Sequence, residues 1–152
     1  MKTKTLITYF TLVNSIVMAQ THSNFKKLFD PTPYGFCHLV QTPNNGKYYF
    51  ISGQSGGQDL QHTLSNNFRT QVEYALKNIK IILDESDLKP EDIVKITLLI
   101  VDHNEEKLKI WNDEMTKLWK NKIFPASTLI PVPRLALDGM LFEIDAIAFK
   151  KN

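Results

Sequence analysis

Cysteine is nearly absent from this 152-residue chain. Its one cysteine, Cys37, cannot form an intramolecular disulfide, so the fold does not depend on one. The adjacent His38 suggests a thiolate–imidazole pair, but neighbouring residues of a strand point to opposite faces. We therefore interpret Cys37 as a buried structural cysteine.

Metal-ligand and phosphate-loop patterns are also missing. The four histidines (His22, His38, His62 and His103) are scattered without the spacing of a metal site, so no metal is expected. Residues 53–57 are rich in glycine, but they lack the spacing and the trailing Lys-Ser/Thr of a phosphate-binding loop.

Long hydrophobic runs are lacking too. The apolar run over residues 6–18 is short and is broken by polar residues, which makes it a poor membrane span. It follows two lysines and ends at Ala19, a pattern typical of a secretory signal peptide over residues 1–19. A packed N-terminal helix is the alternative. We expect export to the periplasm or beyond the cell, with no membrane span after cleavage.

An excess of positive charge is absent from the expected mature chain. Lys2 and Lys4 leave with residues 1–19, so 18 − 2 = 16 basic residues face 16 acidic ones and the formal net charge falls from +2 to 0. General nucleic-acid binding needs a positive surface, so no nucleic-acid partner is expected. The composition is otherwise that of a soluble globular protein of one domain.

Strand and helix signals alternate along the chain. Residues 20–33 look like a loosely ordered lead-in, and residues 34–152 form one domain. Apolar residues at helical spacing predict two helices, over residues 65–83 and 105–120. Ser65 or Asn66 is the expected N-cap of the first helix, and Asp102 or Asn104 that of the second. Runs of β-prone residues predict strands over residues 34–40, 47–52, 92–101, 128–132 and 140–149.

This order predicts an α+β domain in which two helices cover one face of a mixed sheet. A turn at residues 42–46 predicts that the first two strands form a hairpin. The strand over residues 92–101 is almost continuously apolar, which suits a central strand buried on both faces. Because no helix remains for the second sheet face, we expect other subunits of a homo-oligomer to cover it.

Two acidic residues stand on the last, otherwise apolar strand. Glu143 and Asp145 are two positions apart, so side-chain alternation places both on one face. That face is either exposed to solvent or lines a cleft.

Five stretches, taken in order, resemble the reactive-intermediate deaminase family (Rid, also YjgF-type or endoribonuclease L-PSP-like): residues 34–38, 50–54, 71–79, 88–95 and 142–148. The resemblance implies a chorismate-mutase-like fold and a homotrimer with a small-molecule site in each cleft between subunits. It also implies hydrolysis of 2-imino acids to 2-keto acids and ammonia, with neither metal nor cofactor.

The resemblance also implies roles for individual residues. Glu143 would orient the water that attacks the imine carbon, and the Gly53 amide would donate to a ligand oxygen. The substrate-binding residues carried over by position are Tyr34, Ser52, Gly53, Asn112, Ser127 and Leu129.

Ser127 departs from the family pattern, in which an arginine after Pro-Ala grips the substrate carboxylate. Serine cannot hold a carboxylate bidentately, and losing a charge-assisted pair costs about 1.5–3 kcal/mol. Arg134 matches a different family arginine and is interpreted as a surface or interface charge. Three functions stay open: an imine hydrolase, a non-catalytic ligand-binding or structural trimer and, third, an RNA-cleaving protein.

Overall fold

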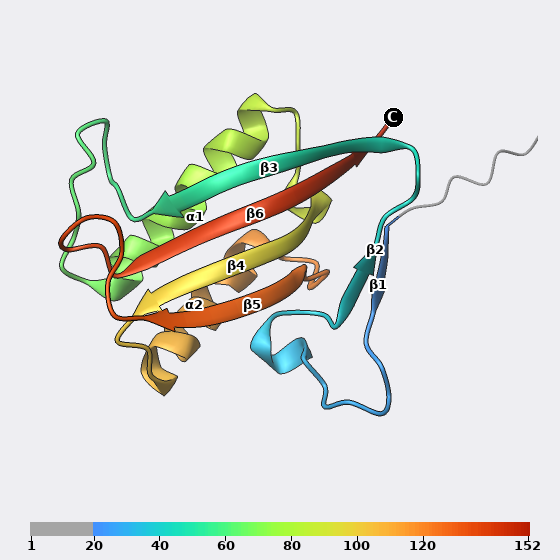
Figure 1. The fold of residues 1–152 in the computed structure, drawn as a ribbon, viewed down its shortest axis with the longest axis horizontal. Coiled ribbons are helices and arrows are strands. Elements are labelled where there is room, and N and C mark those ends of the chain that lie inside the picture. The colour runs from blue at the N-terminus through green and yellow to red at the C-terminus, as the bar shows by residue number, and fades with distance from the viewer. Residues whose placement is uncertain (1–19) are drawn as a thin grey trace, which may run out of the picture.

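The computed structural model describes residues 20–152, so the expected signal peptide lies outside the described residues. Figure 1 shows the arrangement of the elements. They follow in the order β1 (Thr21–Ser23), η1 (Thr32–Tyr34), β2 (Leu39–Gln41), β3 (Gly46–Ser55), α1 (Phe68–Glu85), η2 (Pro90–Asp92), β4 (Ile93–Val101), α2 (Glu105–Leu118), β5 (Ala126–Val132) and β6 (Phe142–Lys151).

A four-stranded mixed sheet forms the centre of the domain, with the strand order β3-β6-β4-β5. β6 pairs antiparallel with both β3 and β4, while β4 and β5 are parallel and are joined through α2. A parallel pair needs such a crossover, and a helix is its usual form. The expected α+β class with a mixed sheet is confirmed.

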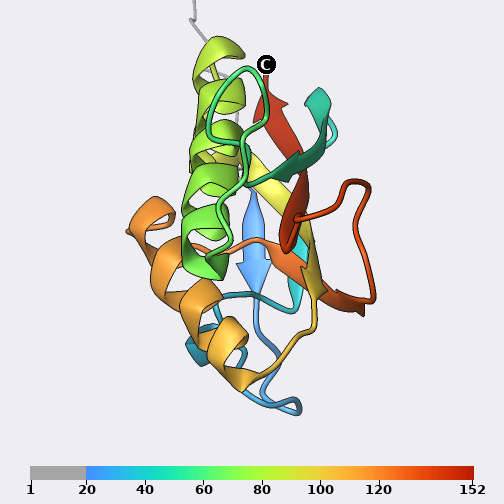
Figure 2. The ribbon, with the colours of Figure 1, turned by 90° about the vertical axis from the view of Figure 1, so that its left-hand side faces the viewer.

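Both helices lie on one side of this sheet, as Figure 2 shows edge-on. The helix side of the sheet carries the core, which includes Leu98, Phe142 and Ile144 with at most 1% of their surface exposed. Trp111 of α2 stacks on Phe142 with ring centroids 5.5 Å apart. The apolar spacing that predicted both helices therefore marks the faces that they bury.

The helix N-termini are capped by asparagines. Asn67 accepts a hydrogen bond from the Thr70 amide at 3.0 Å, so the predicted caps of α1, Ser65 and Asn66, were wrong by one or two positions. Asn104 accepts from the Lys107 amide at 2.9 Å, which confirms one of the two caps expected for α2.

The predicted hairpin between residues 34–40 and 47–52 was wrong. β2 pairs antiparallel with β1, in a separate two-stranded sheet, and the segment expected to be a loose lead-in supplies β1. Cys37, buried as expected, forms an isolated parallel bridge with Ala126 at the start of β5. This bridge holds the N-terminal segment against the edge of the main sheet.

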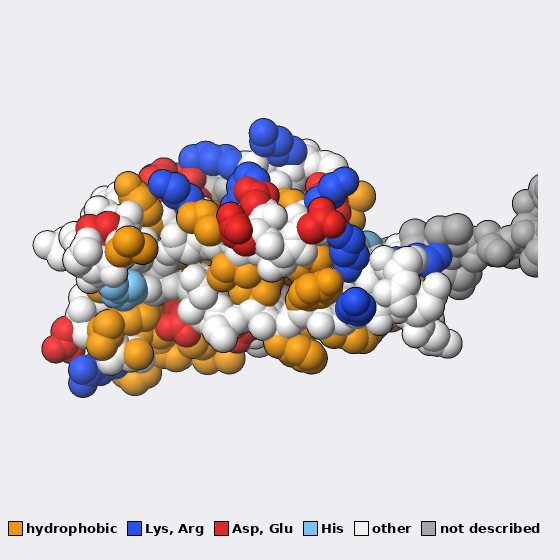
Figure 3. Space-filling model, turned by 90° about the horizontal axis from the view of Figure 1, so that it is seen from above, with side chains coloured by type: hydrophobic (Ala, Val, Ile, Leu, Met, Phe, Trp, Pro, Cys, Tyr) orange, Lys and Arg blue, Asp and Glu red, His pale blue; other side chains and the backbone are white. Residues whose placement is uncertain are grey.

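No helix of the described residues covers the second face of the sheet (Figure 2). Every second residue of β6 and of the middle of β4 is only half-buried there, so the chain alone does not bury β4 on both faces. Large hydrophobic side chains are exposed on the outer strands β3 and β5, namely Tyr48, Phe50 and Ile130, and Phe50 has 79% of its surface accessible. Figure 3 shows charged side chains gathered over the helix layer and hydrophobic ones along the opposite side.

Candidate functional site

Glu143 lies on the helix-free face of the sheet. Its pairing partners are Ser55 on β3 and Leu99 on β4, and it alternates with the buried Phe142 and Ile144. Asp145 follows on the same face opposite Thr97, as the alternation predicted. Among residues 20–152 no side chain or amide donates a hydrogen bond to the Glu143 carboxylate, so its oxygens are free to accept.

A bulge in β3 shapes the surroundings of Glu143. The register of β3 against β6 shifts between Ile51 and Gln54, so Ser52 and Gly53 are the residues within the irregularity. Such bulges re-aim backbone groups and often occur at active sites. A β-carbon at position 53 would lie 2.0 Å from Glu143 Oε1. The carboxylate therefore lies directly over the Gly53 backbone, where only glycine leaves room for it.

Other polar side chains share the helix-free face with this carboxylate: Ser55 is directly opposite Glu143, and Lys95 lies farther along the sheet, opposite Ile147. Ser55 Oγ lies 2.5 Å from His62 Nε2, so the strand partner of Glu143 already has a hydrogen-bonding partner. Partial burial lowers the pKa of Lys95, although the charge of Asp145 acts in the opposite direction. The Lys95 ammonium also contacts the Thr128 hydroxyl on β5.

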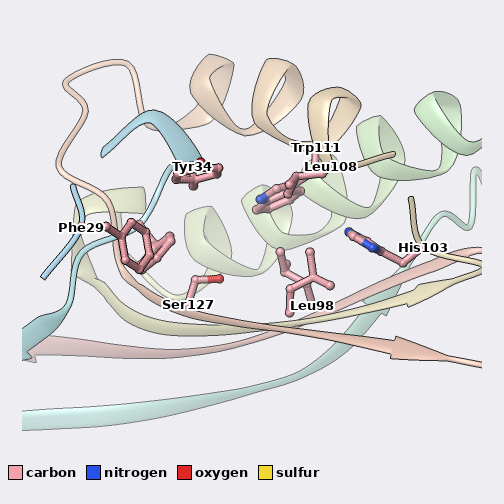
Figure 4. A pocket seen from close by; sticks show the side chains of 9 residues that line it. Phe29, Tyr34, Leu98, His103, Leu108, Trp111 and Ser127 are labelled. Atoms are coloured by element: carbon pink, nitrogen blue, oxygen red, sulfur yellow. The ribbon is translucent and has the colours of Figure 1, made fainter. Parts of the chain in front are cut away.

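A second group of expected residues lies on the helix side of the sheet. Ser127 and Leu129 pair with Ile96 and Leu98 of β4 and share their face, which is the face opposite to Glu143. They line a cavity of about 420 Å³ between β5, α2 and the N-terminal segment, shown in Figure 4. Its walls are Phe29, Tyr34, Phe36, Leu98, His103, Leu108, Trp111, Ser127 and Leu129.

Tyr34 reaches this cavity from the short helix η1. Gly35 ends η1 in the left-handed region at φ 70°, and a β-carbon there would lie 2.2 Å from Met115 Sδ of α2. The Cys37 amide donates to the Pro125 carbonyl at 3.1 Å, just before β5. These two contacts bring Tyr34 to the same cavity as Ser127.

The expected site residues thus form two groups, one on each face of the sheet. Gly53 and Glu143 are in contact on the helix-free face, with Ser52 beside them in the bulge. The cavity residues are on the helix side. Asn112 belongs to neither group: it is on α2 next to Trp111, does not line the cavity, and its Oδ1 is buried without a hydrogen-bond partner. Within one chain the two groups cannot contact the same small molecule, because the sheet separates them.

Neither His103 nor Trp111 was predicted from the sequence as a site residue. Both line the cavity, although Trp111 is also 98% buried. His103 follows Asp102, which takes the left-handed φ of 48° where β4 turns into α2. Lys107 Nζ donates to the carbonyls of Val101 and Asp102 at 2.7 and 3.0 Å and fixes this turn. The sequence feature that could have indicated His103 as a site residue is its position just after a buried strand.

Basic side chains do not reach the cavity. No lysine or arginine is among its walls, and Arg134 instead pairs with Asp138 at 2.9 Å on the surface. Within residues 20–152 there is also no cluster of histidine, cysteine or carboxylate residues that could hold a metal ion. No helix among the described residues has the length and apolarity needed to cross a membrane.

The family model described as Endoribonuclease L-PSP matches residues 32–150. The chain belongs to this Rid/YjgF/RutC family. A RutC family protein of Buchnera aphidicola subsp. Baizongia pistaciae is 33% identical over 125 residues, which cover 80% of this chain and 92% of that relative. The 2-iminobutanoate/2-iminopropanoate deaminase of Salmonella typhimurium is 30% identical over 112 residues, covering 74% and 87% of the two chains.

Solved structures of Rid proteins have the same fold. The conserved Rid family protein YyfB of Yersinia pestis superposes with a TM-score of 0.80 at 26% identity, covering 86% of this chain and 98% of that one. The YjgF gene product of Escherichia coli has a TM-score of 0.61 at 26% identity, covering 74% and 88%. The YjgF-type fold expected from the sequence motifs is therefore confirmed.

Proposed function

We propose that this Rid protein is a homotrimeric imine hydrolase whose site is assembled from two copies of the chain. One copy would supply the cavity with Tyr34, Ser127 and Leu129, and the next would supply Glu143 with the bulge at Ser52 and Gly53. The observation that carries this proposal is the separation of the two residue groups on opposite faces of one sheet. Docking the helix-free face of one copy against the cavity edge of another would bring them together.

Exposed hydrophobic residues support such an assembly. Tyr48, Phe50 and Ile130 are 52%, 79% and 42% exposed, and alternation places Phe50 on the helix-free face. A face of this kind on a soluble domain marks an interaction surface. In a cyclic trimer one patch of each copy contacts a different patch of the next copy, and this arrangement would join the two unlike halves of the site.

The chemistry follows from the free carboxylate. Glu143 would accept a proton from a water molecule as the water oxygen bonds to the imine carbon, and the C=N π electrons would move to nitrogen. Glu143 would pass this proton to the nitrogen to give a carbinolamine. The carbinolamine would release ammonia as its C–N bond breaks, the C=O bond forms and the hydroxyl proton moves to the nitrogen. In total one imine and one water give one 2-oxo acid and one ammonia. Gly53 allows the carboxylate to lie against the strand, and the backbone amide there would orient a substrate oxygen.

A non-catalytic ligand-binding or structural trimer is the second candidate, and Ser127 is the observation that favours it. A hydroxyl replaces the cationic fork that family members use, and no lysine or arginine lines the cavity. Introducing Ser127→Arg separates the two candidates. A gain of hydrolysis over an inactive parent supports the non-catalytic form, while equal activity in both proteins counts against it.

The proposed activity is tested with imines generated in place by an amino-acid oxidase, followed through ammonia release or imine decay. Residues 20–152 should accelerate decay above buffer, and Glu143→Gln should lower the rate by about 10²–10⁴-fold, as for loss of a general base. Asp145→Asn, on the same face and strand, is the matched control and should keep most of the activity. No acceleration by the parent protein for any imine rejects the enzymatic proposal.

We also infer that the chain is exported with removal of residues 1–19, on the basis of the charged start, apolar run and small residues of that segment. Intact mass measurement of the protein from the periplasm or medium should give a chain that begins at Gln20. Full-length protein confined to the cytoplasm would contradict export.

A further inference from the structure

Polar side chains lie at two opposite sides of the cavity beside Ser127. In Figure 4, Ser127 and Tyr34 lie toward one end and His103 toward the other. Leu98 lies below and Trp111 with Leu108 above the space between them. A molecule that reaches from Ser127 to His103 must therefore have an apolar middle.

The size of the cavity exceeds what a three- or four-carbon acid fills. Its volume of about 420 Å³ has room for roughly fourteen water-sized groups at ~30 Å³ each. Pyruvate has about six non-hydrogen atoms, whereas an aryl-substituted 2-oxo acid has about twice that number, close to the capacity estimated from water volume. The walls between Ser127 and His103 contain no aspartate, glutamate, lysine or arginine, so the part of the ligand that lies between these two residues carries no charge.

Aromatic side chains define the middle and the mouth of the cavity. Trp111 is held in place by stacking on Phe142 at 5.5 Å. Phe29, which is 63% exposed, contacts Tyr34 and Phe36 edge-to-face with ring centroids 6.0 Å apart in both pairs. Fixed rings of this kind favour another flat ring through offset or edge-to-face packing.

His103 supplies the remaining recognition element. Its Nε2 is shielded from solvent and has no hydrogen-bond partner within residues 20–152. A buried polar atom without a partner is costly, so its presence needs an explanation. A half-turn of the imidazole about Cβ–Cγ exchanges Nε2 with a carbon position and can present the nitrogen to the cavity that the residue lines. A ligand hydroxyl there would provide the missing partner.

We propose that the ligand of this site is a 2-imino or 2-oxo acid with an aromatic side chain that ends in a hydroxyl or similar hydrogen-bonding group, and that His103 recognises this group. The inference rests on the proposed function in one respect: the reacting end lies at Ser127 and Tyr34, where the second copy would bring Glu143. His103 is thus a specificity-determining residue, and it takes no part in the hydrolysis.

Calorimetric titration of the assembled protein with three stable 2-oxo acids tests this without requiring catalysis. 4-Hydroxyphenylpyruvate should bind most tightly, phenylpyruvate next and pyruvate least. His103→Leu should weaken 4-hydroxyphenylpyruvate about three- to tenfold, the range for one hydrogen bond, and leave phenylpyruvate unchanged. His103→Gln, which keeps a hydrogen-bonding group, should retain part of the preference.

A second variant covers the case in which His103→Leu fails to fold. Leu108→Phe should fill the middle of the cavity and weaken both aryl acids by more than tenfold while pyruvate is unaffected. Equal affinity for all three acids, or an unchanged hydroxyl preference in folded His103→Leu, overturns the inference. Selective aryl binding without hydrolysis overturns the proposed function alone, and hydrolysis without aryl preference overturns this inference alone.

Discussion

The Glu143 carboxylate occupies the space in which a side chain at position 53 would begin, since a β-carbon at Gly53 would lie 2.0 Å from Oε1. The clash is with the flexible end of a side chain, so Gly53→Ala should move the carboxylate and leave the fold intact. We expect at least a tenfold loss of imine hydrolysis with a change in the free energy of unfolding of about 1 kcal/mol or less. Steady-state kinetics measures the loss of hydrolysis, and urea unfolding measures the change in the free energy of unfolding.

Lys47→Ala is the control for this substitution, because Lys47 is exposed on the same strand and lies outside the bulge. It should change the rate much less than Gly53→Ala does. Full activity in Gly53→Ala would show that the position of the Glu143 carboxylate is unimportant.

Gln71 joins α1 to the start of β6. It is fully buried, and its Nε2 donates to the carbonyls of Ser65 and Gly139, both at 2.7 Å, while its Oε1 accepts from the Leu141 amide at 2.8 Å. Gln71→Leu leaves these backbone groups unpaired and should lower the free energy of unfolding by about 3 kcal/mol or more. Urea denaturation measures this free energy. The control is Glu73→Gln at an exposed position of the same helix, whose free energy of unfolding should lie within about 0.5 kcal/mol of the parent value.

Substitution of Phe50 tests whether another subunit covers the helix-free face of the sheet. A carboxylate at this 79%-exposed position would be buried unpaired in an interface, so Phe50→Glu should shift the protein from trimer to monomer in native mass spectrometry. Leu60 is fully exposed on the loop after β3, and Leu60→Glu is the matched control that should remain trimeric. A monomeric parent protein would refute the assembly outright.

Burial raises the pKa of the Cys37 thiol above its ordinary value. The unfolded chain ionises this thiol at its ordinary pKa, while the folded chain keeps it neutral. Its contribution to stability is therefore complete below the ordinary pKa and is lost as pH rises toward the folded value. Iodoacetamide at pH 8 should modify folded protein at least tenfold more slowly than urea-unfolded protein, as measured by mass spectrometry. Equal rates would mean that Cys37 is accessible.

Much of this architecture could be predicted from local patterns. Helical spacing located α1 and α2, and the alternation along β6 placed Glu143 and Asp145 on one face. The pairing of β2 could not be predicted, because β1 is only three residues long and the turn at residues 42–46 favoured a hairpin. Short strands carry little information on their partners, which tertiary packing decides.

The candidate site, like the fold, could be predicted from the sequence only in part. Glu143 and Gly53 were found through family motifs, but their separation from Ser127 by the sheet depends on register, which one sequence does not specify. His103 was missed because its position in the cavity depends on the left-handed backbone of Asp102, a conformation that non-glycine residues rarely adopt.

Complementation between two inactive variants tests most directly whether each site combines two copies of the chain. Glu143→Gln keeps an intact cavity, and Ser127→Trp blocks the cavity but keeps Glu143. Equal amounts of the two variants are unfolded together and refolded into mixed trimers. These trimers should recover about a quarter of parental imine hydrolysis, since one interface in four pairs an intact cavity with an intact Glu143. Complete inactivity of verified mixed trimers beside an active parent would contradict a shared site.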